Sequence, residues 1–126
     1  MGINWTEDLR PLGTDWQKPY LETAPAVCIL FEQTHGIEPE SGVKKTHHYH
    51  EISAAMSAGI FVAALNYCSL CTVTTTPLHA GAKIRELCGR PSNEKVVVLW
   101  PIGYPSDSAT MPILERKKVE EYMIVI

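Results

Sequence analysis

The sequence lacks the features of several large protein classes. It has no basic excess of the kind that nucleic-acid-binding proteins carry, because 14 acidic residues outnumber 11 Lys and Arg and the formal net charge is −3. Its first ten residues are polar and show no apolar core of a secretory signal. The longest nearly uncharged run, Ile52 to Pro77, contains Ser, Asn and Thr throughout, so we expect protein core there and not a membrane span. We therefore expect neither a nucleic-acid binder nor a membrane-spanning chain.

Familiar catalytic and metal-binding motifs are also missing. No HExxH motif, nucleophile–base pair, carboxylate pair or phosphate-binding loop stands out. His47 and Glu51 are spaced i,i+4 near two further histidines, but a zinc site needs a third protein ligand, so we expect no metal. Cys68 and Cys71 have CxxC spacing but follow a predicted helix, where the helix dipole would raise the thiol pKa. In a chain without a secretory signal we expect the four cysteines to be buried thiols and not disulfides.

What the sequence does contain is enough for one domain. The chain has 126 residues, of which 45% are hydrophobic and 20% charged, as in ordinary globular proteins. The stretch from His47 to Pro77 reads as one long helix followed by a strand, with the helix beginning between His47 and His50 and Thr46 as its candidate N-cap. This helix is apolar on every side and therefore needs partners all round. Small residues would let a second helix approach closely, and periodicity does not decide whether that helix belongs to the same subunit or to a second copy; they are Ala54, Ala55, Ala58, Gly59, Ala63 and Ala64.

The remaining elements predict a mixed α+β domain. Short apolar runs predict strands over 26–31, 70–76 and 95–100, and helical spacing followed by Gly and Pro predicts a helix over 80–88. The polar stretch 32–46 contains two glycines and a proline, so we expect a loop with a mobile tip at 37–43. The apolar C-terminus, 119–126, is expected to lie on the chain's own sheet or on a neighbour.

A candidate ligand site begins with three consecutive threonines, Thr74, Thr75 and Thr76, at the end of a predicted strand. Their apolar flanks favour hydroxyls that point into a site, although polar β-branched residues can also simply face solvent. Arg116 offers a fixed positive charge, and Lys18 is a further candidate for binding an anionic group. The residues alone thus predict an α+β domain with a polar ligand site.

Several segments, taken together and in order, resemble the iodotyrosine deiodinases of the nitroreductase superfamily. The segments that carry the resemblance are Trp16, Lys18, Tyr20-Leu21, Thr23-Ala24-Pro25, His48-Tyr49-His50-Glu51-Ile52-Ser53, Thr72-Val73-Thr74-Thr75-Thr76-Pro77-Leu78, Gly89-Arg90-Pro91, Asn93-Glu94-Lys95, Pro101-Ile102-Gly103-Tyr104-Pro105 and Arg116-Lys117. Each is weak alone, but their sum is specific and covers essentially all 126 residues.

The resemblance implies an FMN-dependent oxidoreductase that removes iodide reductively from mono- and diiodotyrosine, with electrons ultimately from NADPH through a reductase. It implies a nitroreductase-like sandwich with a mostly antiparallel sheet flanked by helices, built as an intertwined homodimer. Another nitroreductase-type flavin oxidoreductase and a non-catalytic dimerisation fragment remain as alternatives.

The resemblance also implies roles for individual residues. Thr74, Thr75 and Thr76 match the flavin-binding run, and Thr76 would lie near flavin N5, where a donated hydrogen bond can stabilise a one-electron-reduced flavin. Arg116 matches an arginine that holds FMN, and Lys18 matches the lysine that binds the substrate zwitterion. The family's arginine-rich phosphate motif, Pro-Ser-Gly segment and lid residues do not occur in this sequence. We therefore expect residues 1–126 to be the C-terminal part of a single domain, and we expect weak FMN binding and little turnover from this chain alone.

Overall fold

The computed structural model describes residues 7–126, which fall into two compact units. Residues 19–105 form one unit and hold the sheet and the longer helices. Residues 7–18 and 106–126 belong to the other. The irregular spacing of apolar residues over 1–18 predicts one or two short helices there, and this stretch lies partly outside the described residues.

A three-stranded antiparallel sheet forms the centre of the larger unit. Strand β1 (Ala26–Gln33) pairs with β5 (Glu94–Gly103) along its whole length, and the short β4 (Cys71–Thr72) pairs with the end of β5, giving the order β1-β5-β4. The predicted strands over 26–31 and 95–100 are confirmed and extend further. The predicted strand over 70–76 is shorter, because after β4 the chain returns to β5 only at an isolated bridge between Thr75 and Leu99.

A β-bulge divides β5 into two segments. Leu30 pairs with Val98 and the next residue, Phe31, pairs with Val96, so Val97 is the extra residue of β5. Since neighbouring side chains of a regular strand alternate between faces, an extra residue reverses the faces on one side of the bulge. This places both Lys95 and Val98 on the same side of the sheet.

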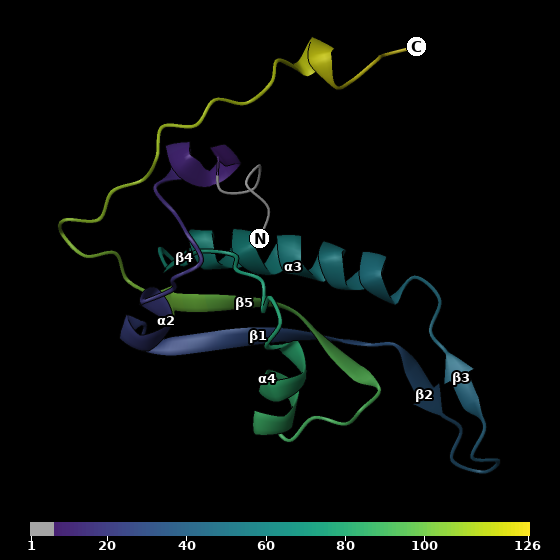
Figure 1. Cartoon of the computed structure of the whole chain (residues 1–126). Helices are drawn as coiled ribbons and strands as arrows, with labels where there is room; N and C mark the ends of the chain where they lie inside the picture. The colour runs from purple at the N-terminus through teal and green to yellow at the C-terminus, as the bar shows by residue number, and fades with distance from the viewer. Residues whose placement is uncertain (1–6) are drawn as a thin grey trace. The chain divides into compact units, whose positions relative to one another are not determined.

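Helices α3 (His50–Tyr67) and α4 (Gly81–Leu87) cover opposite faces of this sheet, as Figure 1 shows. On the α3 face, the rings of Phe61 and Trp100 lie 5.0 Å apart between centroids. On the α4 face, a Cβ added to Gly81 would lie 4.0 Å from Val96 Cβ. A short helix, α2 (Tyr20–Thr23), precedes β1.

Helix α3 begins within the predicted range of 47–50 but without the predicted N-cap. The helix begins at His50, and the residue before it, Tyr49, has a left-handed conformation with φ 64° and no side-chain cap. Thr46 is not the N-cap, because it is the last residue of a strand. The sequence pattern identified the helix itself. It did not reveal the turn before the helix, where Tyr49 adopts a positive φ that non-glycine residues rarely adopt.

The predicted loop over residues 32–46 is mostly a β-hairpin. β1 continues to Gln33, and β2 (His35–Ile37) pairs with β3 (Lys44–Thr46). These three-residue strands are largely polar or glycine-containing, and β3 is fully exposed, so they carry no alternation of apolar and polar residues that sequence reasoning could detect.

The core of the larger unit is small. Its buried hydrophobic residues are Ala54, Leu65, Val96, Leu99 and Trp100. The expectation of buried cysteines was wrong, because Cys68, Cys71 and Cys88 are exposed and Cys28 is only partly buried. All four are free thiols, as expected. An apolar neighbourhood in sequence does not reveal which face of an element is covered.

The smaller unit contains two short 3-10 helices, η1 (Arg10–Leu12) and η2 (Val119–Glu121). None of its described residues is buried. Contact of the apolar C-terminus, 119–126, with the chain's own sheet or with a neighbour stays a prediction. Among the described residues, no helix is both long enough and apolar enough to cross a membrane.

Candidate functional site

The three threonines do not share one environment. Thr75 is 4% exposed, whereas Thr74 and Thr76 are exposed. The cause is the extended backbone, in which alternate side chains point to opposite sides. The bridge to β5 fixes this arrangement, because Thr75 N donates to Leu99 O at 3.0 Å and Leu99 N donates back to Thr75 O at 2.8 Å. Of the three hydroxyls expected to point into one site, that of Thr75 is therefore buried, and binding of one ligand by the whole run stays a prediction.

Thr74 is held by a tryptophan from the neighbouring strand. The indole Nε1 of Trp100 donates a hydrogen bond of 2.9 Å to Thr74 Oγ1. Trp100 is 2% exposed and its ring contacts Phe61 of α3, so the donor is fixed in place. Sequence reasoning missed Trp100, because only the pairing of Thr75 with Leu99 brings Thr74 opposite this residue.

Thr75 presents a different feature. Its hydroxyl oxygen is buried and has no hydrogen-bond partner, and the same holds for Thr72. A buried hydroxyl without a partner costs about 1–3 kcal/mol of folding free energy. The hydroxyl of Thr76, in contrast, is exposed and makes no hydrogen bond within the described part of the chain, so it is available to a ligand.

An apolar groove of about 410 Å³ lies beside Thr74, between α3 and β5. The residues that line it are Ala55, Ala58, Gly59, Val62, Thr74, Val97, Val98 and Trp100. A Cβ added to Gly59 would meet nothing within 4 Å, so the α3 wall leaves open space there. The volume falls within the range of about 300–1,000 Å³ that small-molecule sites occupy. The groove thus combines apolar walls with one fixed hydroxyl.

An ionic cluster lies on the same side of the sheet, at the start of α3. Glu32 is 4% exposed; its Oε2 lies 3.0 Å from His50 Nδ1 and its Oε1 lies 3.2 Å from Lys95 Nζ. Burial alone would raise the pKa of Glu32, but the hydrogen bonds and charges of His50 and Lys95 together hold that pKa below its ordinary value. The bulge at Val97 makes this cluster possible, because it turns Lys95 towards α3.

The same cluster is the place where described residues could hold a metal ion. Ligand atoms of Glu32, His50 and Glu51 lie within 4.8 Å of one another. Both carboxylate oxygens of Glu32 already have partners in His50 and Lys95, so the cluster is satisfied as an ion-pair network. The pair singled out from spacing, His47 with Glu51, is not the one that the structure groups together.

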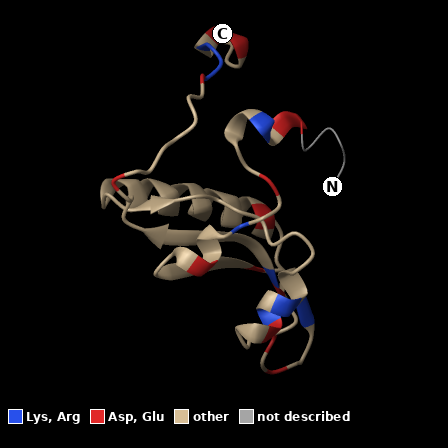
Figure 2. Cartoon of the chain, turned by 60° about the vertical axis from the view of Figure 1, so that its left-hand side comes forward, with Lys and Arg blue, Asp and Glu red and all other residues tan. Residues whose placement is uncertain are grey.

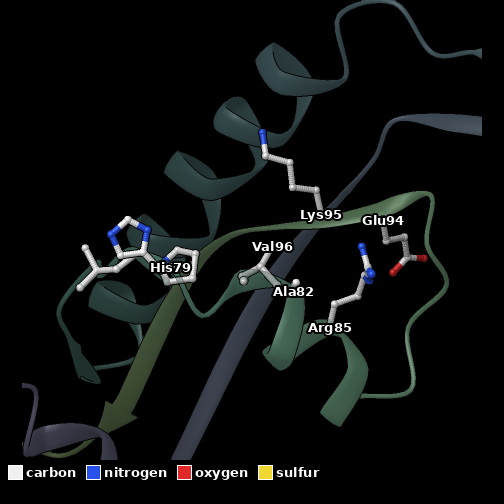
Figure 3. A pocket seen from close by; sticks show the side chains of 9 residues that line it. His79, Ala82, Arg85, Glu94, Lys95 and Val96 are labelled. Atoms are coloured by element: carbon white, nitrogen blue, oxygen red, sulfur yellow. The ribbon is translucent and has the colours of Figure 1, made fainter.

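A second pocket of about 350 Å³ lies beside α4 and includes Arg85 and Glu94 (Figure 3). The Arg90 guanidinium binds the Glu94 carboxylate at 2.7 and 2.6 Å and thereby lowers the pKa of Glu94. Lys95 is drawn among the lining residues, but its side chain points away towards α3. The pocket therefore presents Arg85 and His79 beside Glu94, whose carboxylate is already paired with Arg90.

The two remaining candidate residues belong to the smaller unit. Arg116 is exposed, and Lys18 is partly exposed and makes an interaction with another group. The threonines belong to the larger unit. Convergence of Arg116, Lys18 and the threonines on one ligand therefore stays a prediction.

No family model matches the sequence. The chain is 48% identical over 125 residues to the iodotyrosine deiodinase of the sea anemone Nematostella vectensis, covering 99% of this chain and 47% of that protein. It is 49% identical over 126 residues to iodotyrosine deiodinase 1 of Rattus norvegicus, covering 100% of this chain and 44% of that protein. With the protein of Hydra vulgaris the identity is 51% over 124 residues. The chain thus spans about half the length of the curated relatives it matches.

Among solved structures, the chain matches oxidised iodotyrosine deiodinase bound to FMN and 3-iodo-L-tyrosine. The TM-score is 0.68 at 26% sequence identity, and the match covers 100% of this chain and 58% of the other. The predicted fold class is confirmed: the chain has a mixed α+β fold of the nitroreductase type, with antiparallel sheets.

Proposed function

Because this chain is related in sequence, along its whole length, to about half of the iodotyrosine deiodinase polypeptide, we propose that it forms part of an FMN-dependent enzyme that removes iodide reductively from mono- and diiodotyrosine. The observation that carries the proposal is the identity of about half of all positions over the entire chain. We further propose that residues 1–126 are the C-terminal part of one nitroreductase-like domain.

The chain's own residues fit a flavin. FMN has a flat, largely apolar ring system with hydrogen-bonding atoms at its edge, and the groove beside Thr74 offers apolar walls with a fixed hydroxyl. In this proposal Thr74, Thr75 and Thr76 bind the ring system and Arg116 binds an anionic group of FMN. Thr75 contributes by anchoring the run to β5, since its backbone pairs with Leu99 and its side chain is buried.

Each residue has a role that its chemistry allows. Thr76, with a free and exposed hydroxyl, donates a hydrogen bond to the flavin and is the proposed catalytic residue. Lys18 binds the carboxylate of the amino-acid substrate. When bound, FMN supplies the electrons for reduction, while the protein orients and polarises it.

The proposal includes two partners. A second copy of the chain would contact α3, whose only Lys, Arg, Asp or Glu is Glu51, so that the helix is almost entirely tan in Figure 2. A reductase would deliver electrons from NADPH.

FMN binding tests the proposal directly. We expect the purified chain to quench flavin fluorescence with weak but saturable affinity. Arg116→Ala should weaken binding by about 10- to 100-fold, because a hydrogen bond to a charged group contributes about 1.5–3 kcal/mol. Arg85→Ala is the matched control, since Arg85 lines the pocket beside α4 and not the groove. Equal effects of the two substitutions, or no binding by the wild type, would contradict the proposal.

Substrate binding separates this function from that of other nitroreductase-type enzymes. With FMN present, Lys18→Ala should abolish iodotyrosine binding, measured by calorimetry, and leave FMN affinity unchanged. Lys45→Ala, on the exposed strand β3, is the control. An unchanged affinity for iodotyrosine after Lys18→Ala would favour an enzyme that acts on nitro compounds or quinones.

The exposed apolar residues of α3 favour a second candidate function, a non-catalytic dimerisation module. Ile52, Met56 and Ile60 repeat every four residues and are 59%, 67% and 72% exposed. A dimer that contains no flavin and binds none, observed by sedimentation, would support this alternative.

A further inference from the structure

We propose that Trp100 is a positioning residue that fixes the direction in which Thr74 offers its hydroxyl proton to the bound group; this inference rests on the proposed flavin function. The starting point is the hydrogen bond of 2.9 Å from Trp100 Nε1 to Thr74 Oγ1. Trp100 belongs to β5, and in this inference its indole N–H acts on the bound group through the hydroxyl of Thr74.

The chemistry of the two groups determines the direction of the bond. An indole nitrogen can only donate, so Thr74 Oγ1 must be the acceptor. The threonine hydroxyl proton makes no hydrogen bond within the described residues and remains available. Accepting a hydrogen bond also polarises a hydroxyl and strengthens it as a donor. Thr74 therefore presents a donor, and the atom that binds it must be an acceptor such as a carbonyl oxygen or an unprotonated ring nitrogen.

The surroundings make this arrangement rigid. Trp100 is 2% exposed, and its ring packs against Phe61 with an interplanar angle of 48°. Threonine has few accessible χ1 rotamers, and the bond to the indole selects the one that places Oγ1 next to Trp100. Because Trp100 and Thr74 both line the apolar groove, the fixed hydroxyl is presented at the edge of that groove.

A double-mutant cycle measured by FMN titration tests the inference. Trp100→Phe keeps an aromatic ring but removes the donor, and we expect it to weaken FMN binding by about 3- to 10-fold, the range for one neutral hydrogen bond. Thr74→Val should weaken binding at least as much. The double variant should bind like Thr74→Val alone, because without the hydroxyl the indole has nothing to orient.

A structural control separates positioning from loss of packing. Phe61→Leu disturbs the packing of the same indole but keeps its N–H, so it should lower the melting temperature with less than a twofold change in FMN affinity. In ¹⁵N-labelled protein, the indole resonance of Trp100 should shift when FMN is added, and this shift should be clearly smaller in Thr74→Val, where only the direct effect of a ligand in the groove remains. A purely structural Trp100 would not produce this difference.

The outcomes are distinct. If the wild type binds FMN and the effects of Trp100→Phe and Thr74→Val simply add, the positioning role is wrong and the proposed function stands. If Phe61→Leu weakens binding as much as Trp100→Phe does, the indole acts through packing and the inference also fails. If the wild type binds no FMN, the proposed function and this inference are both overturned.

Discussion

At the scale of single residues, the best-defined charge in the structure is the Glu32 carboxylate. It is buried, and its two oxygens are bound by groups from different elements, His50 of α3 and Lys95 of β5. Removing the carboxylate breaks the link between helix and sheet. The partners left behind are more exposed than Glu32, so water can solvate part of their charge.

Glu32→Gln should reduce the free energy of unfolding at neutral pH by about 1–3 kcal/mol, as expected for hydrogen bonds to a charged group. Chemical denaturation measures this change. Glu86→Gln is the matched control, because Glu86 pairs with Lys83 in a largely exposed ion pair, and such pairs contribute about 0–1 kcal/mol. Equal effects of the two substitutions would show that Glu32 is not an effective link.

Acid should destabilise the wild type through the same carboxylate. The folded-state pKa of Glu32 lies below its ordinary value of 4.5, so its contribution is fully present above pH 4.5 and is lost as the pH falls through the folded-state pKa. Glu94, with its pKa lowered chiefly by the hydrogen bond from Arg90, has the same sign. The melting temperature should fall more steeply with decreasing pH below 4.5 in the wild type than in Glu32→Gln. Parallel curves would contradict this assignment.

The left-handed conformation of Tyr49 leads to another prediction. A residue with a side chain in this region costs about 1–2 kcal/mol, and Tyr49 is largely exposed, so its ring adds little packing. Tyr49→Gly should therefore raise the free energy of unfolding by up to about 1 kcal/mol. Tyr49→Ala keeps the Cβ and should give no gain, and a gain of the same size from alanine would refute the explanation.

At the scale of elements, α3 is the helix that exposes the most apolar side chains among the described residues. One side packs on the sheet through residues such as Phe61 and Leu65, while Ile52, Met56 and Ile60 remain exposed. A helix that is apolar all round is normally buried all round. The exposed side therefore favours a partner surface on α3.

Met56→Lys should convert a dimer into a monomer in sedimentation velocity, because a charge would be buried in the contact. Tyr67→Lys is the control, since Tyr67 lies at the last residue of the helix and is 92% exposed. The melting temperature of isolated monomers should change little in either variant. If Met56→Lys leaves the sedimentation coefficient unchanged, α3 does not mediate association.

The sequence predicted the longer elements well and the short ones poorly. Helix α3 has a long apolar pattern, helix α4 has helical spacing that ends at Gly and Pro, and strand β5 contains a short apolar run. The β2–β3 hairpin was missed because its residues do not alternate, and the brevity of β4 was missed because β-branched residues such as Thr74 favour a strand whether or not a partner strand is present. For the site, the threonine run was visible, but the contact of Thr74 with Trp100 depends on strand register, which the sequence does not specify.

At the scale of the whole molecule, the main fact is that the chain corresponds to 44–47% of the length of the sea anemone and rat relatives. The apolar groove and the exposed side of α3 both lack a cover within the larger unit. The proposed site would be completed by protein surface beyond what this unit supplies.

We therefore expect the purified chain to release little or no iodide from iodotyrosine when FMN and dithionite are supplied. Iodide release per mole of chain is the measurement, with a full-length relative as the positive control. Multiple turnovers by this chain would show that residues 1–126 contain the whole catalytic apparatus.

The bulge in β5 has a consequence for how this sequence can change length. Val97 stands outside the ladder, so deleting it would leave every cross-strand partner of β1 and β5 in place and keep Lys95 and Trp100 beneath the same helix. An insertion elsewhere between Glu94 and Trp100 would instead exchange the two surfaces for all residues beyond it. Natural or engineered length variation in this strand should accordingly concentrate at one position.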